Sequence, residues 1–321
     1  MTDPRTRARW AEEYSARARA YWTEERTKQL VGDKLPIMRP ADAAVLLRAL
    51  GLLRDDASLP PDRARKYFQI NHMVALLLPA LRELRARHPR VRLLDAGCGR
   101  SYLTLLIAWC ARHVWNWELE VIGVDRNPDL IAEARRRAEI AGLDEAVRLE
   151  VGTVEAVDAR DVHGVVALHA CDTATCDALA LGVSLGAELL AVAPCCQAEL
   201  ARGWSALAER GTSGPFSTIW GTPHLRRETA ADVTDAMRTA LLRAAGYDVL
   251  AMEFVPSEHT RKNTLIRAIR RGAPSDAART EYEALRVATG GVGIRLAERL
   301  RGQLHDAEVY ERSSGRREHE Q

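Results

Sequence analysis

An acidic, glycine-containing turn is the part of this sequence best suited to binding a ligand. Asp95, Gly97 and Gly99 follow the apolar run 91–94 and precede a helical pattern that begins at Tyr102. Glycine lets the backbone approach a ligand closely, and the first turn of a helix offers free N–H donors. A dinucleotide fingerprint would need a third glycine where Tyr102 stands. The acid before the glycines instead suits a ligand with a positive charge, such as an ammonium group.

Polar residues also stand where the next predicted strands end. Asp125 closes the second strand and is suited to accept hydrogen bonds from two ribose hydroxyls. Gly152 and Thr153 close the third strand, where an adenine edge could meet backbone and a small side chain. The alternatives are that these residues only form turns, or that they bind NAD, because a ribose acid after the second strand is common to both kinds of site. The predicted cofactor residues are Asp95, Gly97, Cys98, Gly99, Asp125, Arg126, Gly152, Thr153 and His169.

Thiols and an imidazole gather at the ends of the fourth and fifth predicted strands. His169 or Asp172 could take a proton from the substrate, since histidine is the natural base near neutral pH. A cysteine could instead attack the substrate covalently, or the cluster could bind zinc, although vicinal cysteines are poor chelators and we predict no metal. Packing of small buried residues is the fourth interpretation. The predicted catalytic residues are His169, Asp172, Cys195 and Cys196.

Three further segments could contact the substrate. One is the helix that leads into the sheet, one is a long insertion after the fifth strand, and one is the loop that joins the last two strands. A solvated helix face or ordinary turn chemistry is the alternative for each of them. The predicted substrate residues are Lys66, Gln69, Asn71, Cys171, Gln197, His224, His259, Lys262 and Asn263.

The elements that must position these residues alternate between strand and helix, which predicts a doubly wound, Rossmann-like α/β sheet. Only a short loop, 256–262, joins the last two strands, so they must be antiparallel neighbours. The predicted strands are 91–95, 119–125, 147–151, 164–169, 189–193, 247–255 and 264–269. The predicted helices between them are 102–113, 128–141, 173–182 and 230–245.

The composition divides the chain into three parts. We predict an N-terminal helical extension over 1–60, a central domain with its lead-in helix over 61–271, and short helices with a flexible tail over 272–321. Arginines alternate with acids in the extension, which is typical of a solvated face but leaves room for RNA contacts.

Length and charge exclude several classes of protein. The 321 residues are 47% hydrophobic, enough for a substantial core, and the net charge of +2 does not indicate a generally basic nucleic-acid binder. Because we find no membrane span and no signal peptide, we expect a cytoplasmic protein whose six cysteines are reduced.

Three motifs, LHACDTAT (168–175), VAPCCQAEL (192–200) and EHTRKNTLIRAIR (258–270), resemble a bacterial family of class I methyltransferases that use S-adenosylmethionine (SAM). The same domain forms the C-terminus of glutathione-S-transferase-C-terminal-domain-containing proteins. The family is related to tRNA 2′-O-methyltransferases, which continue Cys-Cys with histidine where this sequence has Gln197. The resemblance covers about residues 62–271 and implies the class I methyltransferase sheet and SAM as cofactor.

The sequence as a whole therefore predicts a SAM-dependent methyltransferase. We expect RNA (tRNA or rRNA) as the methyl acceptor, because of the kinship with tRNA enzymes. The alternatives are a small-molecule or natural-product acceptor, which the near-neutral charge favours, and a SAM-binding module without catalysis. No membrane partner is expected, and the sequence does not indicate an oligomeric state.

Overall fold

The structure is a computed structural model that describes residues 3–157, 159–168, 170, 172–194, 197–253 and 264–302. The chain groups into two compact units, Met1–Asp158 and Ala159–Gln321. The predicted division into three parts (1–60, 61–271 and 272–321) differs from these two units and stays a prediction. None of the described helices combines the length and apolarity needed to cross a membrane.

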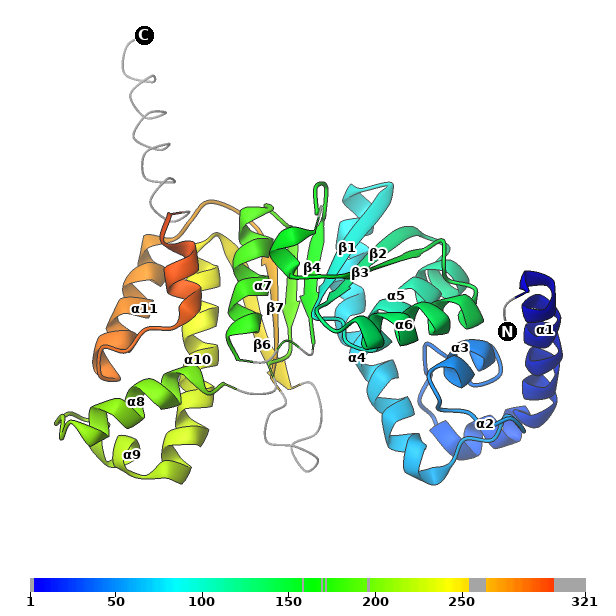
Figure 1. The fold of residues 1–321 in the computed structure, drawn as a ribbon, viewed down its shortest axis with the longest axis horizontal. Coiled ribbons are helices and arrows are strands. Elements are labelled where there is room, and N and C mark those ends of the chain that lie inside the picture. The colour runs from blue at the N-terminus through cyan, green and yellow to red at the C-terminus, as the bar shows by residue number, and fades with distance from the viewer. Residues whose placement is uncertain are drawn as a thin grey trace, which may run out of the picture. The chain divides into compact units, whose positions relative to one another are not determined.

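The first unit begins with four helices (Figure 1, blue to cyan). Helix α1 is capped by the Asp3 side chain, which accepts from the Thr6 backbone N–H at 2.9 Å. Its aromatic residue Tyr14 is 2% exposed and donates its hydroxyl hydrogen to the Arg54 carbonyl at 2.7 Å. The buried Tyr14 side chain therefore ties α1 to the segment before α4. The helices are α1 Pro4–Tyr21, α2 Glu24–Val31, α3 Ala44–Ala49 and α4 Pro61–Arg87.

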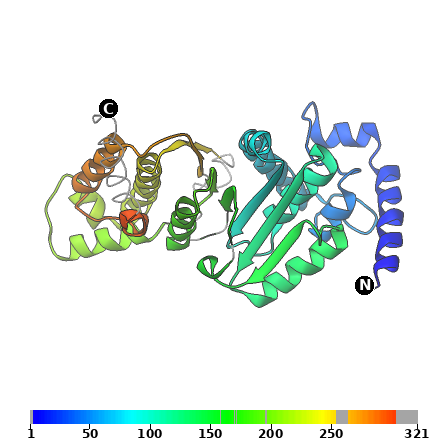
Figure 2. The same ribbon diagram turned by 90° about the horizontal axis from the view of Figure 1, so that it is seen from above.

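Three parallel strands follow in the first unit, in the order β3-β2-β1. They run side by side in Figure 2 (cyan to green). Their registers pair Asp95 with Gly123 and Asp125 with Val151, so that the carboxyl ends of the strands meet at one edge. The elements are β1 Arg90–Ala96, α5 Tyr102–Cys110, a π-helical turn Ala111–Trp115, β2 Glu118–Asp125, α6 Pro128–Ala141, β3 Val147–Val151 and a 3₁₀ turn Val154–Ala156.

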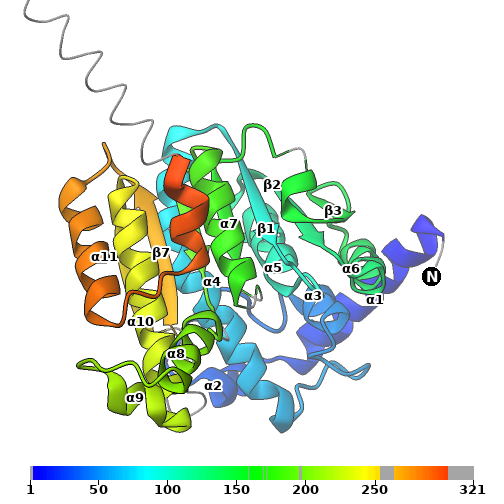
Figure 3. The ribbon, with the colours of Figure 1, turned by 60° about the vertical axis from the view of Figure 1, so that its left-hand side comes forward.

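The second unit has the strand order β4-β5-β7-β6. Strands β4 and β5 are parallel, whereas β7 is antiparallel to both β5 and β6. Helices α10 and α11 lie side by side (Figure 3). The elements are β4 Gly164–Ala167, α7 Thr173–Ser184, β5 Leu189–Val192, α8 Glu199–Glu209, α9 Ser217–Gly221, α10 Pro223–Ala244, β6 Tyr247–Glu253, β7 Thr264–Arg270 and α11 Asp276–Ala288.

These elements confirm the predicted fold class, an α/β doubly wound, Rossmann-like sheet with an antiparallel last strand pair and an N-terminal helical extension. All four residues of β4 and of β5 are buried, as expected for strands covered on both faces. The insertion after β5 is helical, and α10 begins at Pro223, seven residues before the predicted start at Ala230. Proline is favoured at the first position of a helix, which explains the earlier start.

Candidate functional site

The turn after β1 is shaped by residues with left-handed backbone. Gly97 and Gly99 have φ of 71° and 55°, and Ser101, which precedes α5, has φ of 54°. The backbone N–H groups of Gly97 and Cys98 both donate to the Val124 carbonyl at 2.9 Å. A Cβ atom added at Gly99 would meet no atom within 4 Å. The positive φ therefore accounts for glycine at position 99, and the space beside it is open to a ligand.

Asp125 connects the ends of the first two strands. Its Oδ2 accepts from the Gly99 backbone N–H at 2.9 Å, and its Oδ1 accepts from the Asn127 backbone N–H at 2.9 Å. Its own carbonyl accepts from the Gly152 N–H at 2.9 Å, which draws in the end of β3. The carboxylate is only partly buried. Since each carboxylate oxygen can accept more than one hydrogen bond, Asp125 can still take hydroxyl donors from a ligand.

Asp95 is buried beneath the glycine turn. It is 3% exposed, and its Oδ2 accepts from the Thr104 hydroxyl at 2.5 Å. Burial raises the pKa of the Asp95 carboxyl to about 6, against the opposing effect of the Thr104 hydrogen bond. Asp95 therefore supports the first turn of α5 from below, and its predicted contact with an ammonium group stays a prediction.

The remaining predicted cofactor residues of the first unit line the same three strand ends. Cys98 is 2% exposed, accepts a hydrogen bond from the Ser101 hydroxyl at 3.2 Å, and has a thiol pKa raised by burial. It is held as a packed thiol. Arg126 is exposed, and Gly152 and Thr153 are half-buried. A Cβ atom at Gly152 would also meet nothing within 4 Å. The space beside Gly152 is therefore open, as it is beside Gly99.

The lead-in helix α4 brings a cation to the glycine turn. The Lys66 ammonium lies 5.3 Å from the centroid of the Tyr102 ring, and burial lowers the pKa of Lys66. The Arg137 guanidinium lies 5.0 Å from the same ring and donates to the Arg100 carbonyl at 3.3 Å. No sequence pattern indicated a site role for Tyr102, which begins α5, or for Arg137. Arg137 lies on α6, and no local pattern links that helix to the turn.

Two other predicted residues of α4 behave differently from Lys66. Asn71 is 7% exposed, accepts from the Met38 backbone N–H at 2.9 Å and donates to the Tyr67 carbonyl at 3.1 Å. The Asn71 amide thus ties the segment before α3 to α4, which is a structural task. Gln69 is half-buried on the same helix.

Asp172, in the second unit, caps the start of helix α8. Its Oδ1 accepts from the Ala198 and Glu199 backbone N–H groups at 2.9 and 3.0 Å, and its Oδ2 accepts from Arg202 at 2.8 Å. Burial raises the pKa of the Asp172 carboxyl, but the hydrogen bonds and the Arg202 charge outweigh it and leave the pKa lowered. A carboxylate held in this way is a weak base, so the geometry favours a structural role over proton transfer.

Most of the predicted reaction centre lies outside the described residues. This applies to His169, Cys171, Cys195, Cys196, His259, Lys262 and Asn263. Of the other predicted substrate residues in the second unit, His224 is exposed in the first turn of α10, and Gln197 is 6% exposed with its amide bonded to Asp235. Cys110 and Cys176 are buried, as a packing role requires.

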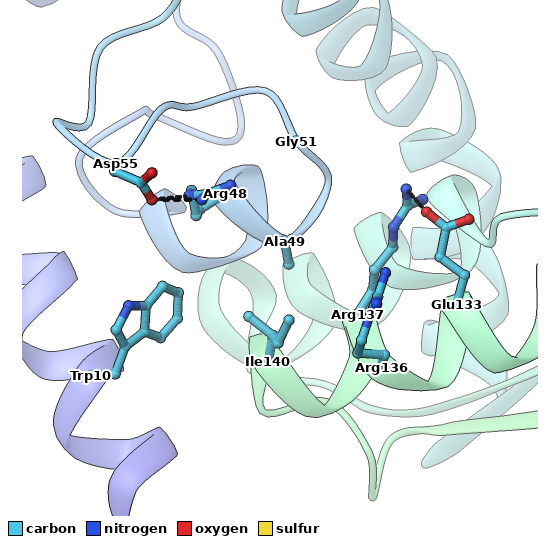
Figure 4. A pocket seen from close by; sticks show the side chains of 9 residues that line it. All are labelled: Trp10, Arg48, Ala49, Gly51, Asp55, Glu133, Arg136, Arg137 and Ile140. Atoms are coloured by element: carbon cyan, nitrogen blue, oxygen red, sulfur yellow. Dashed lines mark hydrogen bonds and ion pairs between the residues drawn. The ribbon is translucent and has the colours of Figure 1, made fainter. Parts of the chain in front are cut away.

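A cavity of about 460 Å³ lies beside the N-terminal extension (Figure 4). It combines one indole with several guanidinium groups, and two of these are paired: Arg48 with Asp55, and Arg137 with Glu133. Arg136 is exposed and has no hydrogen-bond or ion-pair partner within the described part of the chain. The lining residues are Trp10 from α1, Arg48, Ala49, Gly51 and Asp55 from α3 and the loop after it, and Glu133, Arg136, Arg137 and Ile140 from α6.

Comparison with known proteins identifies the domain. Residues 65–203 match a family model described as a methyltransferase domain, a span of less than half of the chain. No curated protein matches the chain.

Several solved structures are similar to the chain. The SAH-bound methyltransferase PaMTH1 of Podospora anserina is 14% identical at a TM-score of 0.43, covering 78% of this chain and 95% of that one. SAH-bound magnesium protoporphyrin IX methyltransferase (ChlM) of Synechocystis is 15% identical at 0.42, covering 71% and 93%. An RNA methyltransferase of Salinibacter ruber is 13% identical at 0.34, covering 64% and 94%. These similarities do not identify an acceptor.

The matched segment, 65–203, includes α4, the glycine turn and the ends of β1 to β5. The match supports a methyltransferase, as the sequence predicts, and SAM as its methyl donor stays a prediction. The predicted relation to glutathione-S-transferase-C-terminal-domain-containing proteins and to tRNA 2′-O-methyltransferases stays a prediction.

Proposed function

We propose that this chain methylates RNA with SAM bound at the ends of β1, β2 and β3. One observation carries the cofactor site: the Asp125 carboxylate accepts the Gly99 N–H at 2.9 Å, which joins the acid after β2 to the glycine turn after β1. The residues present fit the cofactor, because an acceptor for hydroxyls adjoins open space at Gly99 and Gly152. In this proposal Asp125 holds the ribose, and Cys98, Arg126 and Thr153 border the nucleoside.

The two charged ends of the methionine part need partners of opposite sign. Asp95, ionised above its raised pKa, supplies negative charge toward the ammonium. Lys66 supplies positive charge toward the carboxylate from its position over the Tyr102 ring. A buried carboxylate and a half-buried ammonium beside one turn would orient a zwitterion and disfavour the reverse binding mode.

When bound, SAM supplies an electrophilic methyl group, so the chain needs only to orient the acceptor and remove its proton. We assign proton removal to His169, because a histidine titrates near neutral pH whereas the pKa of Asp172 is lowered. Cys171, Cys195 and Cys196 border the acceptor in this proposal. Covalent attack by Cys195 or Cys196 is the second candidate mechanism, and replacing each by serine distinguishes the two.

The cavity beside the N-terminal extension supports RNA as the acceptor. An indole can stack on a base, and guanidinium groups can contact phosphates. Trp10 and Arg136, which has no partner among the described residues, offer both in one cavity of about 460 Å³. We therefore propose that residues 1–60 recognise the acceptor, while 61–271 hold the cofactor and the reaction centre. His224, His259, Lys262 and Asn263 are proposed substrate contacts in the second part.

A small molecule is the alternative acceptor, and the same cavity gives a reason to consider it. Asp55 and Glu133 offset two of the three arginines there, so the cavity is less cationic than most RNA sites. A SAM-binding module without catalysis is the third candidate. We propose a cytoplasmic location, since the acceptor is proposed to be RNA.

The test is transfer of tritium from methyl-labelled SAM to separated RNA, protein and metabolite fractions. We expect label in the RNA fraction, and loss of that label when Asp125 is replaced by alanine. Label confined to metabolites would favour the small-molecule acceptor. SAM binding without label in any fraction would favour the silent module.

A further inference from the structure

The side-chain amide of Gln197 is fixed in one orientation by a carboxylate. Gln197 lies in the loop between β5, which ends at Val192, and α8, and it is 6% exposed. Its Nε2 donates to Asp235 Oδ2 at 2.9 Å. Because an ionised carboxylate only accepts hydrogen bonds, the amide nitrogen must face Asp235 and the amide oxygen must face away from it.

The amide oxygen of Gln197, Oε1, has no hydrogen-bond partner among the described residues, and it is buried. Leaving a buried acceptor unpaired costs about 1–3 kcal/mol, so such atoms are rare in folded proteins. This oxygen lies in the loop that follows β5, on the side of an α/β sheet where ligands bind, and it can accept a hydrogen bond from a ligand.

Asp235 is itself held by a buried arginine. The Arg238 Nη1 donates to Asp235 Oδ1 at 3.0 Å, and the Arg238 side chain is 1% exposed. The Arg238 Nη2 donates to the Asp172 carbonyl at 2.9 Å. One guanidinium on α10 therefore fixes both the loop after β4 and, through Asp235, the amide after β5. The surface residues of α10 do not take part in these contacts.

We propose that Asp235 and Arg238 are positioning residues that present Gln197 Oε1 to an N–H or O–H donor of the methyl acceptor. This inference rests on the proposed methyl transfer and adds a rule for the acceptor: it carries a hydrogen-bond donor near the methylated atom. The site should reject a methyl acceptor that lacks this N–H or O–H group, because the buried oxygen would then stay unpaired.

Replacing Asp235 by asparagine should make Gln197 present its amide NH₂ to the site in place of its amide oxygen. Arg238 is only a donor, so it must keep the asparagine oxygen, and the asparagine NH₂ must then face Gln197. The Gln197 amide turns over to accept from it and presents its own NH₂ to the site. A hydrogen-bond donor of the substrate that receives the methyl group then faces the NH₂ donor of Gln197, and no hydrogen bond forms.

Asp177→Asn provides the matched control. Asp177 also accepts from an arginine, because Arg295 Nε donates to its Oδ1 at 2.7 Å. The Asp177 side chain is 16% exposed, against 12% for Asp235. Both variants remove one carboxylate from an ion pair of the second unit, but Asp177 does not contact Gln197. Thermal unfolding of the two variants measures the structural loss that they share.

The experiment measures methyl transfer to bulk bacterial tRNA by the full-length chain. We expect Asp235→Asn to raise the KM for tRNA about tenfold or more, which corresponds to about 1.4 kcal/mol, with the Kd for SAM unchanged. Asp177→Asn should leave that KM within about twofold. In ¹⁵N spectra, the Gln197 NH₂ signal, assigned by its loss in Gln197→Met, should shift in Asp235→Asn and not in Asp177→Asn.

Two results would overturn the inference alone while the proposed function stands. One is tRNA methylation by the wild type with the same KM change in both aspartate variants, and the other is a Gln197 NH₂ signal that Asp235→Asn does not move. Failure of the wild type to methylate any RNA fraction would overturn the proposed RNA methyl transfer, and the inference with it.

Discussion

Replacing Asp125 by alanine tests the cofactor site most directly. In the ligand-free turn the Asp125 carboxylate accepts two backbone N–H groups at 2.9 Å, from Gly99 and Asn127. The change removes the proposed partner of the ribose hydroxyls and also frees the glycine turn. We expect SAM binding to be lost for both reasons, and the two contributions can be sized separately.

The ribose contribution is the larger one. A hydrogen bond to a charged group contributes about 1.5–3 kcal/mol, and two hydroxyls that share one carboxylate should give about 3 kcal/mol together. At 1.4 kcal/mol for each factor of ten, this is a loss of affinity of about 150-fold. The turn contribution is smaller, because Gly99 and Asn127 lie near the surface and water can replace the carboxylate.

Isothermal titration calorimetry with SAH measures this loss in the absence of turnover. Asp129→Ala is the matched control, because this exposed carboxylate lies four residues further on, in the first turn of α6, and accepts no backbone N–H of the glycine turn. A control affinity equal to the wild type and a fall of two decades for Asp125→Ala are expected. An Asp125→Ala affinity within about twofold of the wild type would refute the ribose assignment.

Three further predictions follow from single contacts. Because burial raises the folded-state pKa of Asp95 to about 6, its stabilising contribution is complete below the usual aspartate pKa of 3.8 and is lost as pH rises through 6. The wild type should therefore lose about 3 kcal/mol of unfolding free energy between pH 4 and pH 7, and Asp95→Asn should not. Urea unfolding at each pH measures this, and the same pH dependence in both proteins would contradict the prediction. Asp172→Ala should lower the unfolding free energy by about 1–2 kcal/mol, because the cap of α8 is lost. The pH profile of the methylation rate should stay unchanged. Loss of an ionisation near neutral pH from that profile would show that Asp172 is the base. Replacing Trp10 and Arg136 by alanine should weaken binding of single-stranded RNA about tenfold in fluorescence anisotropy and lower the salt slope by about one, while exposed Arg82→Ala should change neither; equal effects at all three positions would exclude a specific contact at the cavity.

The sequence predicted those parts of the fold that depend on local pattern. Helix α6 runs from Pro128 to Ala141 as expected, because asparagine at its N-cap, proline at its first position and Gly142 after its end are strong local signals. Asp125 was predicted at the end of β2 for the same kind of reason, since an apolar run leads up to it.

Roles that depend on tertiary contacts were beyond the sequence. Asp172 precedes α7 in the chain yet caps α8, which begins more than two dozen residues later. Asp235 and Arg238 look like ordinary charges of a solvated helix, and only the packing of α10 reveals that both are buried. Local pattern does not encode which charged residues of a long helix face its neighbours, so this buried pair could not have been predicted.

The glycine turn is shaped before anything binds to it. The Gly97 and Cys98 N–H groups share the Val124 carbonyl, and the Thr104 hydroxyl fastens the start of α5 to Asp95. A loop already restrained in this way loses little conformational entropy when it receives a nucleoside, so more of the contact energy remains as affinity. Such preorganisation predicts nearly identical backbone order parameters for residues 95–101 in the free and bound protein.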